Sequence, residues 1–276
     1  MTNLAQIGAV EPKRSGEKGT TSTQNTQYDQ IGTKYNFVHE LPSVEPERPS
    51  VIKALGNIRG KRCMDLACGT GRYTALLSSL GAASVHGYDI SSAMVDGAMA
   101  AYPSSTHSSL RFRVADCSIP GAIQHDIKFD IVFAGWFLDY AGTERELTNM
   151  FKVIVENLSQ DGRFVGITTN THDTRMADTR IEFYGIDVLV LDPNYVAPDT
   201  GSEVGVVAKV RARTEPVVEF EVFQFRKEVY QRCAEAAGMR LSWGDVVLPH
   251  DERVENGYWN AFIERPTFTI VTGVVV

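Results

Sequence analysis

The chain has 276 residues, of which 43% are hydrophobic and 22% are charged, as is typical of one large globular domain. Its formal net charge of −7 argues against nucleic acid or an anionic membrane as the main partner, because these attract clustered lysine and arginine. The four cysteines are scattered and form no C-x-x-C pair, so we expect buried, reduced thiols and no metal site.

Residues 1–27 are rich in Ser, Thr, Gly, Asn and Gln and predict a disordered tail. The tail lacks the apolar run of a signal peptide, and no later stretch is apolar for long enough to span a bilayer. These features predict a cytoplasmic protein. We further expect a small-molecule substrate and a monomeric or homodimeric state.

From residue 50 onward, strands and helices alternate. In chain order, the pattern predicts a helix at 50–55, a strand at 62–66, a helix at 71–80, a strand at 84–88, a helix at 91–101, strands at 110–115 and 129–133, a helix at 144–157 and a strand at 162–168. This spacing is typical of a parallel sheet with helices on both faces, and it places a single domain over residues 28–276.

The alternation stops at about residue 181. Within 181–225, two β-branched runs at 203–213 and 217–225 flank a turn that contains Pro216, and they predict an antiparallel hairpin. We interpret 181–225 as a β-rich insertion after the fifth strand that covers the active edge of the sheet. The pattern then predicts a helix at 227–237 and strands at 241–248 and 267–275.

Residues 65–71, DLACGTG, lie where the first strand meets the next helix. Glycine lets a backbone approach a ligand closely, and a helix N-terminus offers free N–H groups to a carboxylate or phosphate. A dinucleotide site would have a third glycine where Thr74 stands. Asp65 would repel a pyrophosphate and attract an ammonium group. The loop therefore predicts S-adenosylmethionine as the cofactor, with a dinucleotide as the alternative.

Acidic residues also follow the next two strands. Asp89 ends the second strand, where related folds place the acid that binds ribose hydroxyls. Asp116 and Cys117 follow the third strand, where a carboxylate can accept the adenine amino group and a backbone N–H can donate to a ring nitrogen. The alternatives are a helix-capping role for Asp89 and an ordinary loop position for Asp116.

Aromatic side chains are candidates for the wall of an acceptor pocket. Trp136 follows the fourth strand and either faces the reacting centre or belongs to the core. Aromatic residues of the insertion either line the pocket or form the insertion's own core. The predicted pocket residues are Phe37, Trp136, Tyr140, Tyr184 and Phe223.

These motifs resemble the class I methyltransferase family, whose fold is a seven-stranded Rossmann-like sheet. The resemblance rests on residues 65–71, Asp89, Asp116, Cys117 and the strand at 129–133, and it extends over about residues 28–275. It implies an N-terminal lid and a cap inserted after the fifth strand. The cofactor-binding residues assigned from the motifs and this resemblance are Tyr28, Tyr35, Asp65, Ala67, Gly69, Gly71, Asp89, Ile90, Met94, Asp116, Cys117 and Ala134.

Within this family the chain is similar to natural-product tailoring enzymes of fungi. Among these it resembles the bis-thiomethyltransferases that act on epidithiodiketopiperazine dithiols such as that of gliotoxin. This similarity implies S-methylation of a thiol in secondary metabolism. The alternatives are O- or N-methylation of a small metabolite, a reaction other than methylation such as cyclisation, and a binding module without catalysis.

The need for a general base depends on the acceptor. A thiol, with a pKa of about 8.5, needs little help, whereas a phenol or alcohol needs a base. His39, His172 and His250 are the candidates, but no carboxylate stands at a spacing that would orient any of them. We therefore expect catalysis by proximity and orientation, without one essential base.

Overall fold

The computed structural model describes residues 27–276, so the predicted disordered tail lies outside the described residues except for Gln27. The main sheet has seven strands in the order β10-β11-β5-β4-β1-β2-β3. Its strands are β1 (Arg62–Leu66), β2 (Ser84–Asp89), β3 (Leu110–Val114), β4 (Phe129–Gly135), β5 (Leu158–Thr169), β10 (Met239–Gly244) and β11 (Phe268–Val275). The first five pair in parallel, whereas β11 pairs antiparallel to both β5 and β10.

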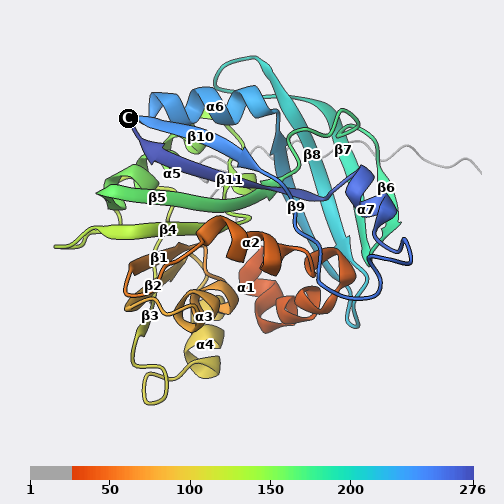
Figure 1. Ribbon diagram of the computed structural model, residues 1–276. Coiled ribbons are helices and arrows are strands. Elements are labelled where there is room, and N and C mark those ends of the chain that lie inside the picture. The colour runs from red at the N-terminus through yellow and green to blue at the C-terminus, as the bar shows by residue number, and fades with distance from the viewer. Residues whose placement is uncertain (1–26) are drawn as a thin grey trace, which may run out of the picture.

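Helices cover both faces of the main sheet (Figure 1). Alternation along β4 sends Val132 into a core with α5 and α6, and Phe133 into the opposite core with α2 and α3. The sequence therefore predicted the parallel α/β arrangement correctly. The helices around the sheet are α2 (Glu47–Leu55), α3 (Arg72–Ser79), α4 (Ser92–Ala101), α5 (Glu144–Asn157), α6 (Lys227–Ala236) and α7 (Asn260–Glu264).

Two of the helix starts follow directly from their capping residues. The Ser91 side chain accepts a hydrogen bond from the Met94 N–H at 3.3 Å and caps α4. Thr143 and Glu146 form a capping box at the start of α5, with each side chain accepting from the other residue's backbone N–H. These caps fix the starts of the helices that follow β2 and β4.

A second, antiparallel sheet lies beside the main sheet (Figure 1). It contains β6 (Arg180–Phe183), β7 (Ile186–Val196), β8 (Glu203–Ala212) and β9 (Val218–Phe225), in that order. The hairpin predicted at 203–225 is confirmed as β8 and β9, and the insertion after β5 is a β-rich cap as predicted. We call this second sheet the cap sheet.

The N-terminal segment packs between the main sheet and the cap sheet (Figure 1). It contains α1 (Tyr28–Ile31) and two 3₁₀ turns, η2 (Gly32–Glu40) and η3 (Pro42–Val44). Val38 and Val44 share a buried cluster with Ile186 and Phe220 of the cap sheet. Residues 27–44, which we call the lid, therefore close the space between the sheets, as expected for this fold.

Two further observations bear on the sequence expectations. All four cysteines are buried free thiols. Among residues 27–276, no helix combines the length and apolar character needed to cross a membrane.

Candidate functional site

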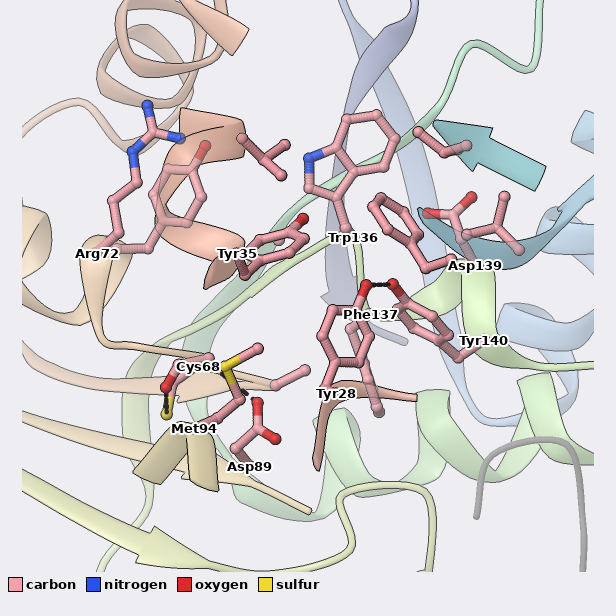
Figure 2. Close-up of a pocket in the computed structure, with 18 of the residues that line it drawn as sticks. Tyr28, Tyr35, Cys68, Arg72, Asp89, Met94, Trp136, Phe137, Asp139 and Tyr140 are labelled. Atoms are coloured by element: carbon pink, nitrogen blue, oxygen red, sulfur yellow. Dashed lines mark hydrogen bonds between the residues drawn. The ribbon is translucent and has the colours of Figure 1, made fainter. Parts of the chain in front are cut away.

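A cavity lies where the lid, the cap sheet and the carboxyl ends of β1, β2 and β4 meet. A short turn after β4, η4 (Leu138–Tyr140), contributes a further wall. In Figure 2 Tyr28 reaches between the two sides of this cavity. One side carries Cys68, Asp89 and Met94, and the other carries Trp136, Phe137, Asp139 and Tyr140.

The two glycines of the loop after β1 have different roles. Both have positive φ, +54° at Gly69 and +87° at Gly71. A Cβ atom on Gly69 would meet no described atom within 4 Å, and the residue faces the cavity. A Cβ atom on Gly71 would lie 3.0 Å from the Phe112 ring and 3.1 Å from the Tyr102 ring. Gly69 thus allows a ligand to approach the backbone, whereas Gly71 allows α3 to pack.

Asp89 is held at the end of β2 by backbone N–H groups. Its Oδ2 accepts from the Gly69 N–H at 2.8 Å, and its Oδ1 accepts from the Ser91 N–H at 2.9 Å. Burial raises the pKa of this carboxyl, and the two backbone donors oppose the rise. Asp89 therefore joins the glycine loop to the start of α4, and Ile90 and Met94 line the cavity next to it.

Asp116 and Cys117 line the neighbouring part of the cavity wall, after β3. Asp116 Oδ1 accepts from the Ser118 N–H at 2.9 Å and from the Ser118 hydroxyl at 2.5 Å. Burial raises the pKa of the Cys117 thiol. These two residues and Asp89 follow adjacent parallel strands, so a single elongated ligand could contact all three.

Aromatic side chains of the lid form a further wall of the cavity. The hydroxyl of Tyr28 is hydrogen-bonded to that of Tyr140 (Figure 2). The Tyr28 ring centroid lies 5.4 Å from that of Tyr35, 5.6 Å from that of Tyr140 and 5.9 Å from that of Phe220. Burial raises the pKa of Tyr28, so its phenol is neutral at physiological pH. The lid, η4 and the cap sheet thus meet at one aromatic contact.

A buried polar cluster centred on Glu47 forms another wall. Glu47 accepts from Arg72 Nη1 at 3.2 Å, from Trp136 Nε1 at 2.9 Å and from the Tyr73 hydroxyl. Arg72 also donates to His39 Nδ1 at 3.1 Å. Burial, with the charge of Arg72, lowers the pKa of His39 to about 3. Because the guanidinium can only donate, the neutral imidazole carries its proton on Nε2 and offers a donor.

The other two candidate bases do not line this cavity. The His172 ring packs edge-on against Trp243, with 6.1 Å between centroids, beside a separate polar groove. His250 lies in the loop between β10 and α7. His39 is therefore the one predicted histidine that reaches the cavity.

Asp139 was missed by the sequence reasoning. It lines the cavity from η4, and its carboxylate accepts from the Thr168 hydroxyl and the Thr169 N–H of β5. The Tyr230 hydroxyl of α6 donates to it at 3.4 Å. Burial raises the pKa of Asp139 to about 7, and these donors oppose the rise. No local spacing marks this residue, because its donors come from parts of the chain 29 to 91 residues away.

Three residues predicted to bind the cofactor lie outside the cavity wall. Asp65 is buried behind the loop, where its Oδ2 accepts from the Thr74 hydroxyl at 2.6 Å. Gly71 faces Phe112, and Ala134 points into the core beneath the sheet. Thr74, at the position of the missing third glycine, thus binds the carboxylate that we expected to attract an ammonium group.

Three aromatic residues predicted for the acceptor pocket also lie elsewhere. The Phe37 side chain is 41% exposed at the lid surface. Tyr184 stacks on Trp259, with 5.2 Å between centroids. Phe223 lies on the opposite face of β9 from the cavity and packs against Tyr195. Alternation along β9 explains the last error, because Phe220, Val222 and Gln224 share the inner face instead.

Most predicted residues do meet at the cavity. They are Tyr28, Tyr35, Ala67, Gly69, Asp89, Ile90, Met94, Asp116, Cys117, Trp136 and Tyr140. Trp136 has a φ of +62°, a conformation that costs energy in a bulky residue and is typical of binding sites. The residues missed include Glu47, Arg72 and Tyr73, of which the last two directly follow the glycine loop in the sequence.

Known proteins share both the loop region and the fold. Residues 63–162 match a family model described as a methyltransferase domain. A sequence relative, an uncharacterized protein from Haemophilus influenzae, is 28% identical over 120 residues, which are 43% of this chain and 46% of the relative. The matched part therefore spans about half the length of that relative.

Solved structures extend the similarity to nearly the whole chain. The CcbJ methyltransferase from Streptomyces caelestis is 17% identical, with a TM-score of 0.63 over 92% of this chain and 98% of its own. The complex of DhpI with SAM and HEP is 19% identical, with a TM-score of 0.58 over 91% of this chain and 95% of its own. The chain therefore has the Rossmann-like fold of class I S-adenosylmethionine-dependent methyltransferases, with a methyltransferase domain match at residues 63–162.

Proposed function

We propose that this protein transfers a methyl group from S-adenosylmethionine to a small-molecule acceptor. The observation that carries the proposal is the placement of Gly69, Asp89 and Asp116 along one cavity wall, after adjacent parallel strands. The match of residues 63–162 to a methyltransferase domain also supports binding of S-adenosylmethionine along this wall.

The residues present fit the cofactor. Asp89 can accept both hydroxyls of a ribose, because its carboxylate is fixed at the cavity wall by two backbone donors. Asp116 can accept an exocyclic amino group, and the open approach to Gly69 leaves room for the methionine part. When bound, S-adenosylmethionine supplies the reactive methyl group.

The protein's own part is to position the acceptor and exclude water. The lid and cap sheet enclose the cavity, and the aromatic rings of Tyr28, Tyr140 and Trp136 face it. Such rings can stabilise a cationic methyl group at close range. Alignment of an acceptor with that methyl group can contribute about 7–11 kcal/mol to lowering the barrier.

The acceptor we propose has an apolar body. The cavity-facing side of the cap sheet presents Ile186, Val188, Val210, Phe220 and Val222. A thiol of a secondary metabolite is the accepting group that we favour from the resemblance to fungal tailoring enzymes, with a hydroxyl or an amine as the alternatives. A cytoplasmic location and a monomeric or homodimeric state stay predictions.

A matched set of acceptors tests the proposal. The enzyme would be incubated with methyl-labelled S-adenosylmethionine and 2-naphthalenemethanethiol, 2-naphthalenemethanol or 2-(aminomethyl)naphthalene, which share an apolar body and differ only in the accepting group. Mass spectrometry should detect a labelled product and S-adenosylhomocysteine. Labelled thioether in excess over the other products would support S-methylation.

Cofactor binding is measured separately by calorimetry. The Asp89→Ala variant should bind S-adenosylmethionine about 5- to 150-fold more weakly, as expected for a lost charge-assisted hydrogen bond of about 1–3 kcal/mol. Asp126→Ala, at an exposed loop position, is the matched control and should bind normally. A folded protein that binds no S-adenosylmethionine would overturn the proposal, and binding without label transfer would favour a non-methylating reaction.

A further inference from the structure

Asp139 is a carboxylate of the acceptor side that is anchored by two other elements of the fold, β5 and α6. It lies on η4, directly before Tyr140, and only 1% of its surface is exposed. Its Oδ1 accepts from the Thr168 hydroxyl at 3.1 Å, from the Thr169 N–H at 3.2 Å and from the Tyr230 hydroxyl at 3.4 Å. Its Oδ2 shares only the Thr168 hydroxyl, at 3.2 Å.

The hydrogen bonds are shared unequally between the two carboxylate oxygens of Asp139, and Oδ2 remains able to accept a further hydrogen bond. A carboxylate has about four lone-pair sites, and two of the three donors, the Thr169 N–H and the Tyr230 hydroxyl, act on Oδ1 alone. Oδ2 competes with Oδ1 for a single hydrogen atom, so it keeps acceptor capacity in a residue that lines the cavity. A buried carboxylate with unused acceptor capacity beside a cavity suits the removal of a proton from a bound molecule.

We propose that Asp139 is the general base of this enzyme and that the acceptor enters with its proton, as a thiol or a hydroxyl. Asp139 Oδ2 takes the proton of the acceptor group as the lone pair of its sulfur or oxygen forms the bond to the methyl carbon. The methyl–sulfonium bond breaks, and its electron pair stays on the cofactor sulfur. The proton is later released from Asp139 to water. This inference rests on the proposed methyl transfer.

The surroundings of Asp139 suit this task near neutral pH. The titratable groups that act on it are Tyr230, from α6, and Tyr140, next to it on η4. Burial raises the pKa of both phenols well above the ordinary value, so both stay neutral. The charge of Asp139 is therefore set mainly by its own burial, which raises its pKa to about 7, and by its hydrogen-bond donors. His39 is unsuited to the role, because its Nδ1 already accepts from Arg72.

The decisive test is the pH dependence of turnover in three variants, with 2-naphthalenemethanethiol and 2-naphthalenemethanol as acceptors, because both keep their proton near neutral pH. In the native enzyme, kcat/KM should rise with pH through about 7, because the base must be ionised. Asp139→Asn keeps the shape of the side chain but cannot accept a proton. It should lower kcat about 100-fold or more and remove the rise, while binding S-adenosylmethionine with native affinity.

Thr168→Val separates a catalytic role from a structural one. It removes the donor shared by both oxygens, which disfavours the ionised form, so the rise in kcat/KM should move to higher pH. Thr269→Val is the matched control, because Thr269 is also a buried strand threonine and donates instead to the Gly244 carbonyl. Its profile should match that of the native enzyme.

Each outcome decides the question. Native turnover in Asp139→Asn, or loss of its cofactor binding, would overturn the proposal. Infrared difference spectra of native protein against Asp139→Asn give an independent reading. A carboxyl that titrates near neutral pH supports the assignment, and one that titrates below about pH 5 contradicts it. Failure of the proposed function would show separately, as a native enzyme that binds no S-adenosylmethionine or that binds it and methylates neither acceptor.

Discussion

At the scale of single residues, neighbouring side chains decide what each part of the glycine motif does. Gly69 and Gly71 share a positive φ and look equivalent in the sequence. One faces the cavity, and the other faces the rings of Phe112 and Tyr102. The general position of the motif could be predicted from glycine chemistry. Which glycine faces the ligand and which one allows packing could not, because this depends on residues of β3 and of the end of α4, which are distant in the chain.

This difference gives a paired prediction. Gly71→Ala should lower the thermal midpoint clearly, because its Cβ would press on two rings, at a cost of about 1–3 kcal/mol. Gly69→Ala carries only the shared cost of positive φ, so it should lose less stability. It should nevertheless weaken S-adenosylmethionine binding about tenfold or more, because the added methyl group projects into the cavity. Thermal denaturation and calorimetry on both variants would test this, and equal destabilisation with equal affinity would contradict the assignment.

Asp65 gives a prediction about stability and pH. Burial raises its pKa from 3.8 to about 7, so folding favours the protonated carboxyl. Ionisation of Asp65 therefore lowers the free energy of unfolding as the pH rises from about 4 to about 7, by an amount on the order of 4 kcal/mol. Asp65→Asn cannot ionise but can still accept from Thr74.

The measurement is urea denaturation of native protein and of Asp65→Asn at pH 4.5 and pH 7.5. The stability of the variant relative to the native protein should increase between the two pH values. A stability difference that is the same at both pH values would show that Asp65 titrates normally in the folded protein.

At the scale of elements, side chains of the lid form hydrogen bonds with several other parts of the fold. The Gln27 amide forms two hydrogen bonds with the backbone of Glu221 on β9, at 2.7 and 3.0 Å. The Ser91 hydroxyl donates to Asp29 at 2.6 Å, and the Tyr28 hydroxyl is bonded to that of Tyr140. These hydrogen bonds add to the apolar packing of Val38 and Val44 against the cap sheet. Because the lid consists of short helical turns and has no strand pairing, we expect it to open at a lower free energy than the sheets unfold.

Tyr28→Phe should therefore loosen the lid without unfolding the protein. It removes the hydroxyl bonded to Tyr140, and a typical loss of about 1 kcal/mol corresponds to roughly fivefold faster release of S-adenosylmethionine. Tyr195→Phe is the control, because it removes a comparable hydrogen bond, to the Gly142 carbonyl, away from the cavity. Stopped-flow release rates would distinguish them, and equally fast release from both variants would argue against a lid function for this contact.

The accuracy of the sequence predictions also depends on the type of element. The strands and helices of the main sheet follow from regular alternation and from caps such as Ser91 and Thr143, which are local signals. In the cap, β6 and β7 were missed, because β7 contains Pro193 and its pairing with β8 shifts between Asp192 and Tyr195. The residues that face the cavity from the cap sheet form much of the acceptor wall. They could not be assigned from the sequence, because the strand pairing of the cap sheet was not known.

At the scale of the whole molecule, the cofactor-binding wall and the acceptor wall come from different structural layers. Asp89 and Asp116 belong to the main sheet, Tyr28 to the lid, and Phe220 to the cap sheet. Asp139, on η4, is fixed to β5 and α6 of the main-sheet layer. A ligand that fills the cavity should therefore stabilise the folded chain as a unit, since it contacts the native arrangement of all three layers and has no such site in the unfolded chain.

Saturation with S-adenosylhomocysteine tests this coupling. At about 100 times its Kd, it should add about 2.7 kcal/mol to the free energy of unfolding, which corresponds to a rise of roughly 5 °C in the thermal midpoint for a chain of this length. At the same concentration of S-adenosylhomocysteine, the thermal midpoint of the Asp89→Ala variant should rise much less, because weaker binding leaves fewer molecules of the variant with ligand bound. Hydrogen exchange should slow in the lid and in β9 of the native protein as well as around Asp89. Protection confined to the loop after β1 would contradict the coupling and would assign cofactor binding to the main sheet alone.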